Sequence, residues 1–328
     1  MSGPQPRTKL QHYVPRFHLK RFANSEGQIW VFDIITGEAR LANPNYVGAE
    51  KNYYSPIQMD GSRFDELEEL LSKIESTAAP LIEPLVRGRR LIGSDRKAVA
   101  DFLSMQYLRS PMMIEAMADM LGQLIHKHQE GILRSRPQSD EVFDEIDRKT
   151  GVKTSPPQRE EIREKLLRHG SVQVNVMREI GLPVVLGYER IAKILQDLTW
   201  VVFDTSRNHM VTSDSPVVKV YDQRTYHSVY GDGGFLNKSM YVTFPLGPNR
   251  VLELFWGSGD PGGVQKADSQ GAKLYNKQRV LRAVKSIFSS ANESGISRLI
   301  VKYAQAARPR ITFGGPTPMV SVKRSLPD

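Results

Sequence analysis

The sequence predicts an α+β protein: an N-terminal small β unit, a central helical block, and a C-terminal antiparallel sheet followed by helices. Two changes of hydrophobic periodicity lead to this prediction. Near residue 62 a period of 3.6 replaces strand-like alternation, and at Trp200 short strand-like runs replace the helical pattern. Blocks in this order indicate the α+β class, and no internal repeat is apparent.

Residues 11–56 form the first block and predict a small antiparallel unit. The run Ile29–Ile35 is rich in β-branched and aromatic residues, as strands are. Thr36 and Gly37 predict a turn, after which the chain returns through 39–42.

Residues 62–198 predict helices with short connections. Leu67 to Leu85 supply one apolar face, a second helix opens at Ser94, and a third follows Pro111. Residues 134–157 contain Arg-Pro, alternating charges and Ser-Pro-Pro, so we expect a flexible, irregular insertion there.

Residues 200–305 predict β structure followed by helices. We expect about five or six strands, over 200–203, 210–212, 217–221, 226–230, 241–245 and 251–256. Helices are expected over 267–289 and 293–305. Residues 309–328 predict an irregular tail, which leaves residues 1–308 as one domain.

The composition excludes several classes of protein. Of 328 residues, 40% are hydrophobic and 25% charged, which is globular composition rather than that of a wholly disordered chain. The absence of cysteine excludes disulfides, cysteine-ligated metals and a thiol nucleophile. No apolar run approaches the roughly 18 residues of a membrane span, and the N-terminus has no apolar signal core. We therefore expect a cytoplasmic protein with no membrane partner.

The net charge of +9 favours an anionic partner. Basic residues gather at both ends and in a third cluster, made of Arg87, Arg89, Arg90, Arg96 and Lys97. Because basic groups bind phosphates and aromatic faces can stack on bases, we expect a nucleic acid or nucleotide as partner. Arg16 and Arg21, among aromatics near the start, are the expected ligand-binding residues. The alternative is solvated chain ends and ordinary core aromatics.

Three positions carry candidate catalytic chemistry. His12 precedes Tyr13-Val14-Pro15, where a stiff backbone could hold it as acid or base. Asp214 lies at a strand end in Thr-Ser-Asp-Ser-Pro and could hold Mg²⁺ or Mn²⁺, orient His12 or act as a base. Arg109 interrupts an apolar helix face, where a guanidinium suits a phosphate. The structural alternatives are a backbone-bonded histidine, an Asx turn and a buried network.

Two further polar residues are ligand-binding candidates. Gln106 breaks the same helix face as Arg109 and must find partners or line a cleft. Asn276 lies on a late helix. A third feature, Gly257-Ser258-Gly259-Asp260-Pro261-Gly262, formally matches GxGxxG. It lacks the parallel βαβ context of a dinucleotide site, so we expect only a loop.

The order of these segments resembles the bacterial DUF4238 family of uncharacterised proteins. The similar segments, over roughly residues 11–290, are His12–Phe22, Ile29–Asp33, Tyr53–Ser55, Leu70–Ala78, Phe102–Pro111, Thr212–Pro216, Phe244–Pro248 and Asn276. The resemblance supplies no established reaction. It implies one family-length unit and convergence of His12, Gln106, Arg109, Asp214 and Asn276.

Three functions follow as expectations. The first is a nuclease-like enzyme acting on phosphodiesters, in bacterial defence or as a toxin, with His12 as acid or base and Arg109 stabilising phosphate charge. The second is a non-catalytic module that binds nucleic acid or a nucleotide. The third is an interaction or scaffold protein whose polar residues hold the two β-rich parts together.

Overall fold

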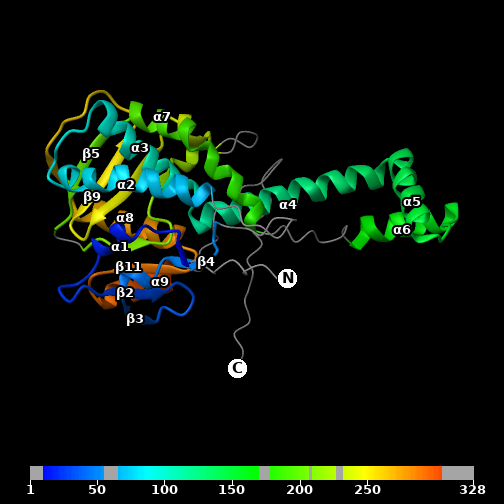
Figure 1. Ribbon diagram of the computed structural model, residues 1–328, viewed down its shortest axis with the longest axis horizontal. Helices are drawn as coiled ribbons and strands as arrows, with labels where there is room; N and C mark the ends of the chain where they lie inside the picture. Colours follow the sequence, from blue (N-terminus) through cyan, green and yellow to red (C-terminus); the bar gives the residue numbers. More distant parts are fainter. Residues whose placement is uncertain (1–9, 55–65, 170–177, 207–208, 227–231, 305–328) are drawn as a thin grey trace, which may run out of the picture.

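A computed structural model describes residues 10–54, 66–169, 178–206, 209–226 and 232–304 and shows the expected α+β architecture (Figure 1). Helices α2, α3 and α7 cover one face of a five-stranded sheet, and α8 covers the other. A second sheet of four strands lies beside α8 and α9. The prediction for residues 309–328 lies outside the described residues.

The N-terminal unit contains the predicted hairpin. Strands β2 (Ile29–Asp33) and β3 (Ala39–Ala42) pair antiparallel, and Asp33 Oδ1 accepts the N–H groups of Ile35 and Thr36 in the turn. Two more short strands, β1 (Leu10–His12) and β4 (Ala49–Lys51), pair antiparallel. Helix α1 (Arg16–Lys20) follows β1 in the chain, and a 3-10 turn, Pro44–Tyr46, precedes β4.

The helical block follows the apolar periodicity of the sequence. Its helices are α2 (Glu66–Val86), α3 (Gly93–Leu108), α4 (Pro111–Arg134), α5 (Arg136–Thr150), α6 (Pro156–His169) and α7 (Tyr188–Asp197), with a 3-10 segment at Arg178–Gly187. The face of α2 from Leu67 to Leu85 is buried at three- and four-residue intervals, as expected. Ser110-Pro111 begins α4: Ser110 accepts the N–H of Met113, and Pro111 occupies the first turn.

The prediction of irregular structure at 134–157 is wrong, because most of this segment is helical. Residues 136–150 form α5, because Pro137 lies in the first helical turn, where the missing N–H costs nothing. Helices α4, α5 and α6 form an arm that projects from the rest of the molecule (Figure 1). Phe143 is buried between α5 and α6, and Arg163 donates to Ser139 and Asp140 across them.

The C-terminal sheet is mostly, but not wholly, antiparallel. Its strands are β5 (Thr199–Asp204), β7 (Val218–Val220), β8 (Tyr241–Gly247), β9 (Arg250–Phe255) and β10 (Val264–Lys266), in the order β10-β5-β9-β8-β7. The edge strand β10 pairs parallel with β5, which the sequence did not predict. Most of the strand expected at 226–230 lies outside the described residues, and short 3-10 turns occur at Gln223–Thr225 and Gly234–Leu236.

The expected helix 267–289 is two elements. Helix α8 (Ser269–Arg282) ends, and β11 (Ser286–Ser289) follows, before α9 (Ser294–Tyr303). Strand β11 pairs with β2 on one side and with β6 (Thr212–Ser213) on the other. Because Ile287 and Phe288 are buried by this pairing, distant contacts override the local helical pattern. The four-stranded sheet β3-β2-β11-β6 thus joins the two β-rich parts of the chain.

The largest core cluster includes side chains of α2, α3 and α7 and the facing side chains of β8 and β9, among them Phe102, Val242, Phe244 and Leu252. Over the described part of the chain, every helix is too short or too polar to cross a bilayer.

Candidate functional sites

His12 lies in β1, and its ring is bonded to the backbone. Nε2 is 3.1 Å from the carbonyl oxygen of Asn45, in the 3-10 turn Pro44–Tyr46. Burial lowers the pKa of His12 below its ordinary value, and the nearby charge of Arg16 acts in the same direction. Arg16 itself is exposed one turn further on. The imidazole is therefore neutral at pH 7.

Gln106 and Arg109 do come together, in a buried network. Arg109 Nε and Nη2 donate to Gln106 Oε1 at 2.8 and 2.6 Å, and Nη1 lies 2.6 Å from Glu75 Oε1. Gln106 Nε2 in turn donates to the carbonyl of Tyr13 at 2.9 Å. Burial disfavours the charge, but Glu75 and Tyr54 outweigh burial and raise the pKa of Arg109. The network ties α3 to α2 and to the segment after β1.

Asp214 is fully buried and holds the backbone just before β11. Its carboxylate accepts the N–H groups of Val284, Lys285 and Ser286, and Ser215 Oγ lies 3.3 Å away. Its own N–H donates to the carbonyl of Ser286 at 3.1 Å. Burial raises the pKa of Asp214 to about 6, although the N–H donors act in the opposite direction.

The remaining predicted residues hold other parts of the fold. Asn276, on α8, accepts the N–H of Val211 at 3.1 Å and donates to the carbonyl of His209 at 2.7 Å. Arg21 Nε donates to the carbonyl of Leu246 at 2.5 Å, and its Nη2 pairs with Glu83 at 3.1 Å.

The five residues expected to converge therefore divide into groups. His12 lies within electrostatic reach of Arg109, which contacts Gln106 directly. Asp214 and Asn276 instead fix opposite ends of the stretch 211–214. Among the described residues, no three His, Asp or Glu side chains gather closely enough to hold a metal ion, so Mg²⁺ or Mn²⁺ at Asp214 stays a prediction. The catalytic roles of His12, Arg109 and Asp214 stay predictions as well.

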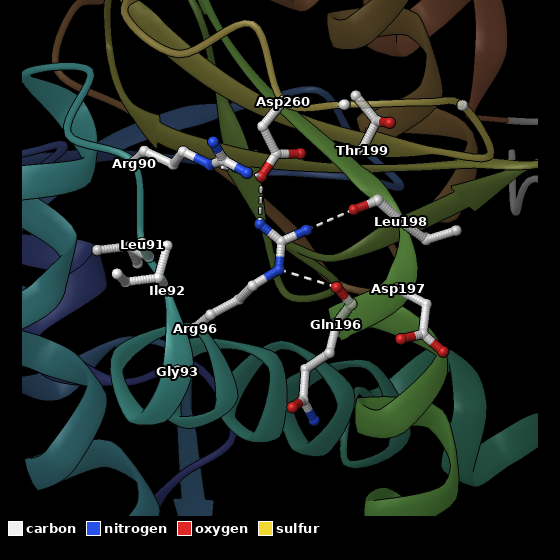
Figure 2. Close-up of a pocket in the computed structure, with 12 residues that line it drawn as sticks. Arg90, Leu91, Ile92, Gly93, Arg96, Gln196, Asp197, Leu198, Thr199 and Asp260 are labelled. Carbon is white, nitrogen blue, oxygen red and sulfur yellow. Dashed lines mark hydrogen bonds and ion pairs between the residues drawn. The ribbon is translucent and has the colours of Figure 1, made fainter.

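A surface cavity of about 320 Å³ lies elsewhere, at the start of α3 (Figure 2). Its walls come from the basic cluster, from the α7–β5 junction and from the loop after β9, and they include Arg90, Ile92, Gly93, Leu198, Gly259 and Asp260. The N-cap residue of α3, Ile92, offers no side-chain oxygen to the first turn. Ile92 and Gly93, where α3 begins, line the cavity, so the positive end of the helix dipole lies at its wall.

Arg96 fixes the walls of the cavity. Nε donates to the carbonyl of Gln196 at 2.8 Å, Nη2 donates to that of Leu198, and Nη1 lies 2.5 Å from Asp260 Oδ2 (Figure 2). Its guanidinium also stacks 4.5 Å from the centre of the Trp200 ring. Arg90 approaches the same Asp260 oxygen more loosely, at 3.6 Å, and its side chain is 60% exposed. Arg90 is therefore held less tightly than Arg96.

The sequence indicates the segments that line this cavity but not that they lie side by side. Sequence reasoning singled out the basic cluster and, separately, treated Gly257–Gly262 as a loop without a ligand role. Asp260 of that loop meets Arg90 and Arg96 through contacts more than 160 residues apart in sequence. Their opposite charges were the only signal that could have paired them.

Comparison with known proteins places the chain in a family. The model of DUF4238, described as a protein of unknown function, matches residues 10–293, and the chain belongs to this family. No curated protein and no solved structure matches the chain.

The buried pair of Arg109 predicts a specific loss of stability. Changing Glu75 to Gln removes the counter-charge of a guanidinium that is 1% exposed, so we expect a loss of about 2–3 kcal/mol in the free energy of unfolding. Urea denaturation measures it. The control is Glu83→Gln on the same helix, whose partners are more exposed, with a loss below about 1 kcal/mol. Equal losses in the two variants would contradict the network.

Asp214 predicts a dependence of stability on pH. Its pKa is about 6 in the folded protein against an ordinary 3.8, so the folded state binds the extra proton between these values. The group therefore makes the protein less stable as pH rises through this window. Relative to Asp214→Asn, wild type should lose roughly 2–3 kcal/mol between about pH 4 and about pH 7, measured by urea unfolding.

Asp204 is the control, because its effect on stability has the opposite dependence on pH. The Ser206 N–H group and then the Ser206 side chain lower its carboxyl pKa. Its contribution is present above the ordinary pKa and is lost as the pH falls. A stability difference between wild type and Asp214→Asn that stays flat over this range would refute the account of Asp214.

Proposed function

We propose that the protein binds a phosphate-bearing ligand, a nucleotide or a nucleic-acid strand, at the cavity of Figure 2. One observation carries the proposal: a cavity of about 320 Å³ combines the positive end of α3 with the exposed guanidinium of Arg90. The volume is that of a small-ligand pocket. Helix N-termini and arginines are the groups that proteins use most often to hold phosphate oxygens.

The surrounding charges support the same ligand class. Arg87 and Arg89 lie beside Arg90 on the turn after α2, and their side chains are 76% and 63% exposed. They pair with Glu83 and Asp95 at the surface, at 3.1 and 3.6 Å. Exposed pairs of this kind are weak, so a phosphate can replace the carboxylates at small cost. The net charge of +9 adds a general attraction for polyanions.

Arg90 gives the direct test. We expect Arg90→Ala to weaken binding about tenfold and to reduce the salt dependence of binding by about one phosphate contact. Fluorescence anisotropy with a labelled nucleotide, single-stranded DNA and single-stranded RNA, at several salt concentrations, measures both quantities and separates the ligands. The control is Arg136→Ala on the projecting arm, where the side chain is 73% exposed. Binding that Arg90→Ala and Arg136→Ala change equally would contradict the proposal.

Phosphodiester cleavage is the second candidate, favoured by the protonation state of His12. Its lowered pKa keeps the imidazole in the form that a general base requires. Cleavage of labelled DNA or RNA with Mg²⁺ or Mn²⁺, lost in His12→Ala without a change in Tm, is the expected result. Substrates left intact by the wild type would leave the protein a binding module.

A further inference from the structure

Arg279 is the second deeply buried arginine of the fold, and it differs from Arg109 in its partners. It lies on α8 facing β8 and is 1% exposed. Nη1 donates to Thr243 Oγ1 at 2.8 Å, whereas Nε and Nη2 are buried and have no hydrogen-bond partner among the described residues. Buried polar groups are bonded in the great majority of cases, so two unbonded N–H positions on one guanidinium require an explanation.

No described side chain compensates the charge of this guanidinium. Within the described residues, Arg279 forms no ion pair with any carboxylate, and Tyr275 and Tyr241 are the groups whose interaction favours its charge. The nearby carboxylate Glu253 instead accepts the hydroxyl of Tyr275 at 2.8 Å. Burial lowers the pKa of Arg279 to about 9, so the side chain is still a cation at pH 7. An uncompensated buried cation costs several kcal/mol.

The unbonded atoms have the geometry of a binding edge. Nε and Nη2 form one side of the planar guanidinium, and their two N–H bonds are parallel. This fork matches two oxygens of a phosphate, a sulfate or a carboxylate. The third nitrogen is already held by Thr243, which fixes the orientation of the plane.

A second unbonded polar group lies in the same interior. His18 is fully buried, and its Nε2 is 2.8 Å from Thr212 Oγ1, but its Nδ1 has no partner in the part of the chain that the structure describes. The charge of Arg279 is close enough to lower the pKa of His18, behind the larger effects of burial and Arg21. The neutral ring can therefore donate from Nδ1 when Nε2 accepts from Thr212.

We propose that the Nε and Nη2 edge of Arg279 binds a small oxyanion of the phosphate class between α8 and β8. The site is distinct from the surface cavity and does not depend on the function proposed for it. Because the guanidinium is closed off from solvent, the anion enters when α8 separates locally from the sheet. Bound there, it supplies the counter-charge that the protein lacks.

The test compares wild type with Arg279→Lys and Arg279→Met in inorganic phosphate, sulfate and chloride of equal ionic strength. Phosphate should raise the Tm of wild type by at least about 2 °C more than chloride does. Arg279→Lys keeps the charge but not the fork, so titration calorimetry should show phosphate binding at least about tenfold weaker. In an Arg90→Ala background, which weakens phosphate binding at the surface cavity, Arg279→Met should lose the phosphate-specific shift completely. Sulfate separates a general oxyanion site from one selective for phosphate.

Two control variants locate the anion. Arg282→Met, one turn further along α8, and Arg136→Ala, on the projecting arm, should both keep the phosphate-specific rise in Tm. The proposal is overturned if wild type shows no shift beyond that of chloride. It is also overturned if either Arg279 variant keeps the wild-type shift, because the anion then binds elsewhere.

Discussion

The carboxylate of Asp214 holds the junction on which the rest of the structure depends. By accepting three successive backbone N–H groups at 284–286, it sets the point where β11 begins. Strand β11 then pairs with β2 and β6, which come from segments about 250 and 75 residues away in the chain. Lys285, in the same turn, forms an ion pair with Glu50 of β4. One buried carboxylate thus connects the N-terminal β unit to the C-terminal half.

Arg109 and Arg279, each 1% exposed, show that the same residue type can have different roles. The guanidinium of Arg109 donates to Gln106 and pairs with Glu75, so its charge is compensated inside the protein. Within the described ranges, Arg279 bonds only to Thr243, and its unbonded edge has the geometry for an anion. Arg90 and Arg96 at the cavity differ in the same respect. Arg96 uses its N–H donors to hold the cavity walls, whereas Arg90 is loosely held. An arginine whose N–H groups all have partners in the protein is structural, whereas one with unbonded N–H groups is a candidate binding residue, whether it is buried or exposed.

The sequence predicted what local patterns determine. The apolar period of α2 and the Thr36-Gly37 turn were sufficient for the helix and the hairpin. Strand β11 was missed because Ile287 and Phe288 continue the apolar pattern of α8, and only pairing with β2 and β6 makes them a strand. Gln106 and Arg109 were predicted to find partners or line a cleft, and Arg109 bonds to Gln106 and pairs with Glu75. Whether a partner is backbone or ligand depends on tertiary contacts, so Arg279 and His18 carried no signal of their own.

We propose that the start of α3 and the loop facing it recognise the ligand, while Asp214 and its neighbours maintain the fold. Hydrogen–deuterium exchange with and without a nucleotide or oligonucleotide tests this claim most directly. The account predicts ligand-dependent protection of residues 92–96 and 257–260, which line the cavity. Protection concentrated at 10–16 and 212–216 would contradict it and return the search to His12 and Asp214.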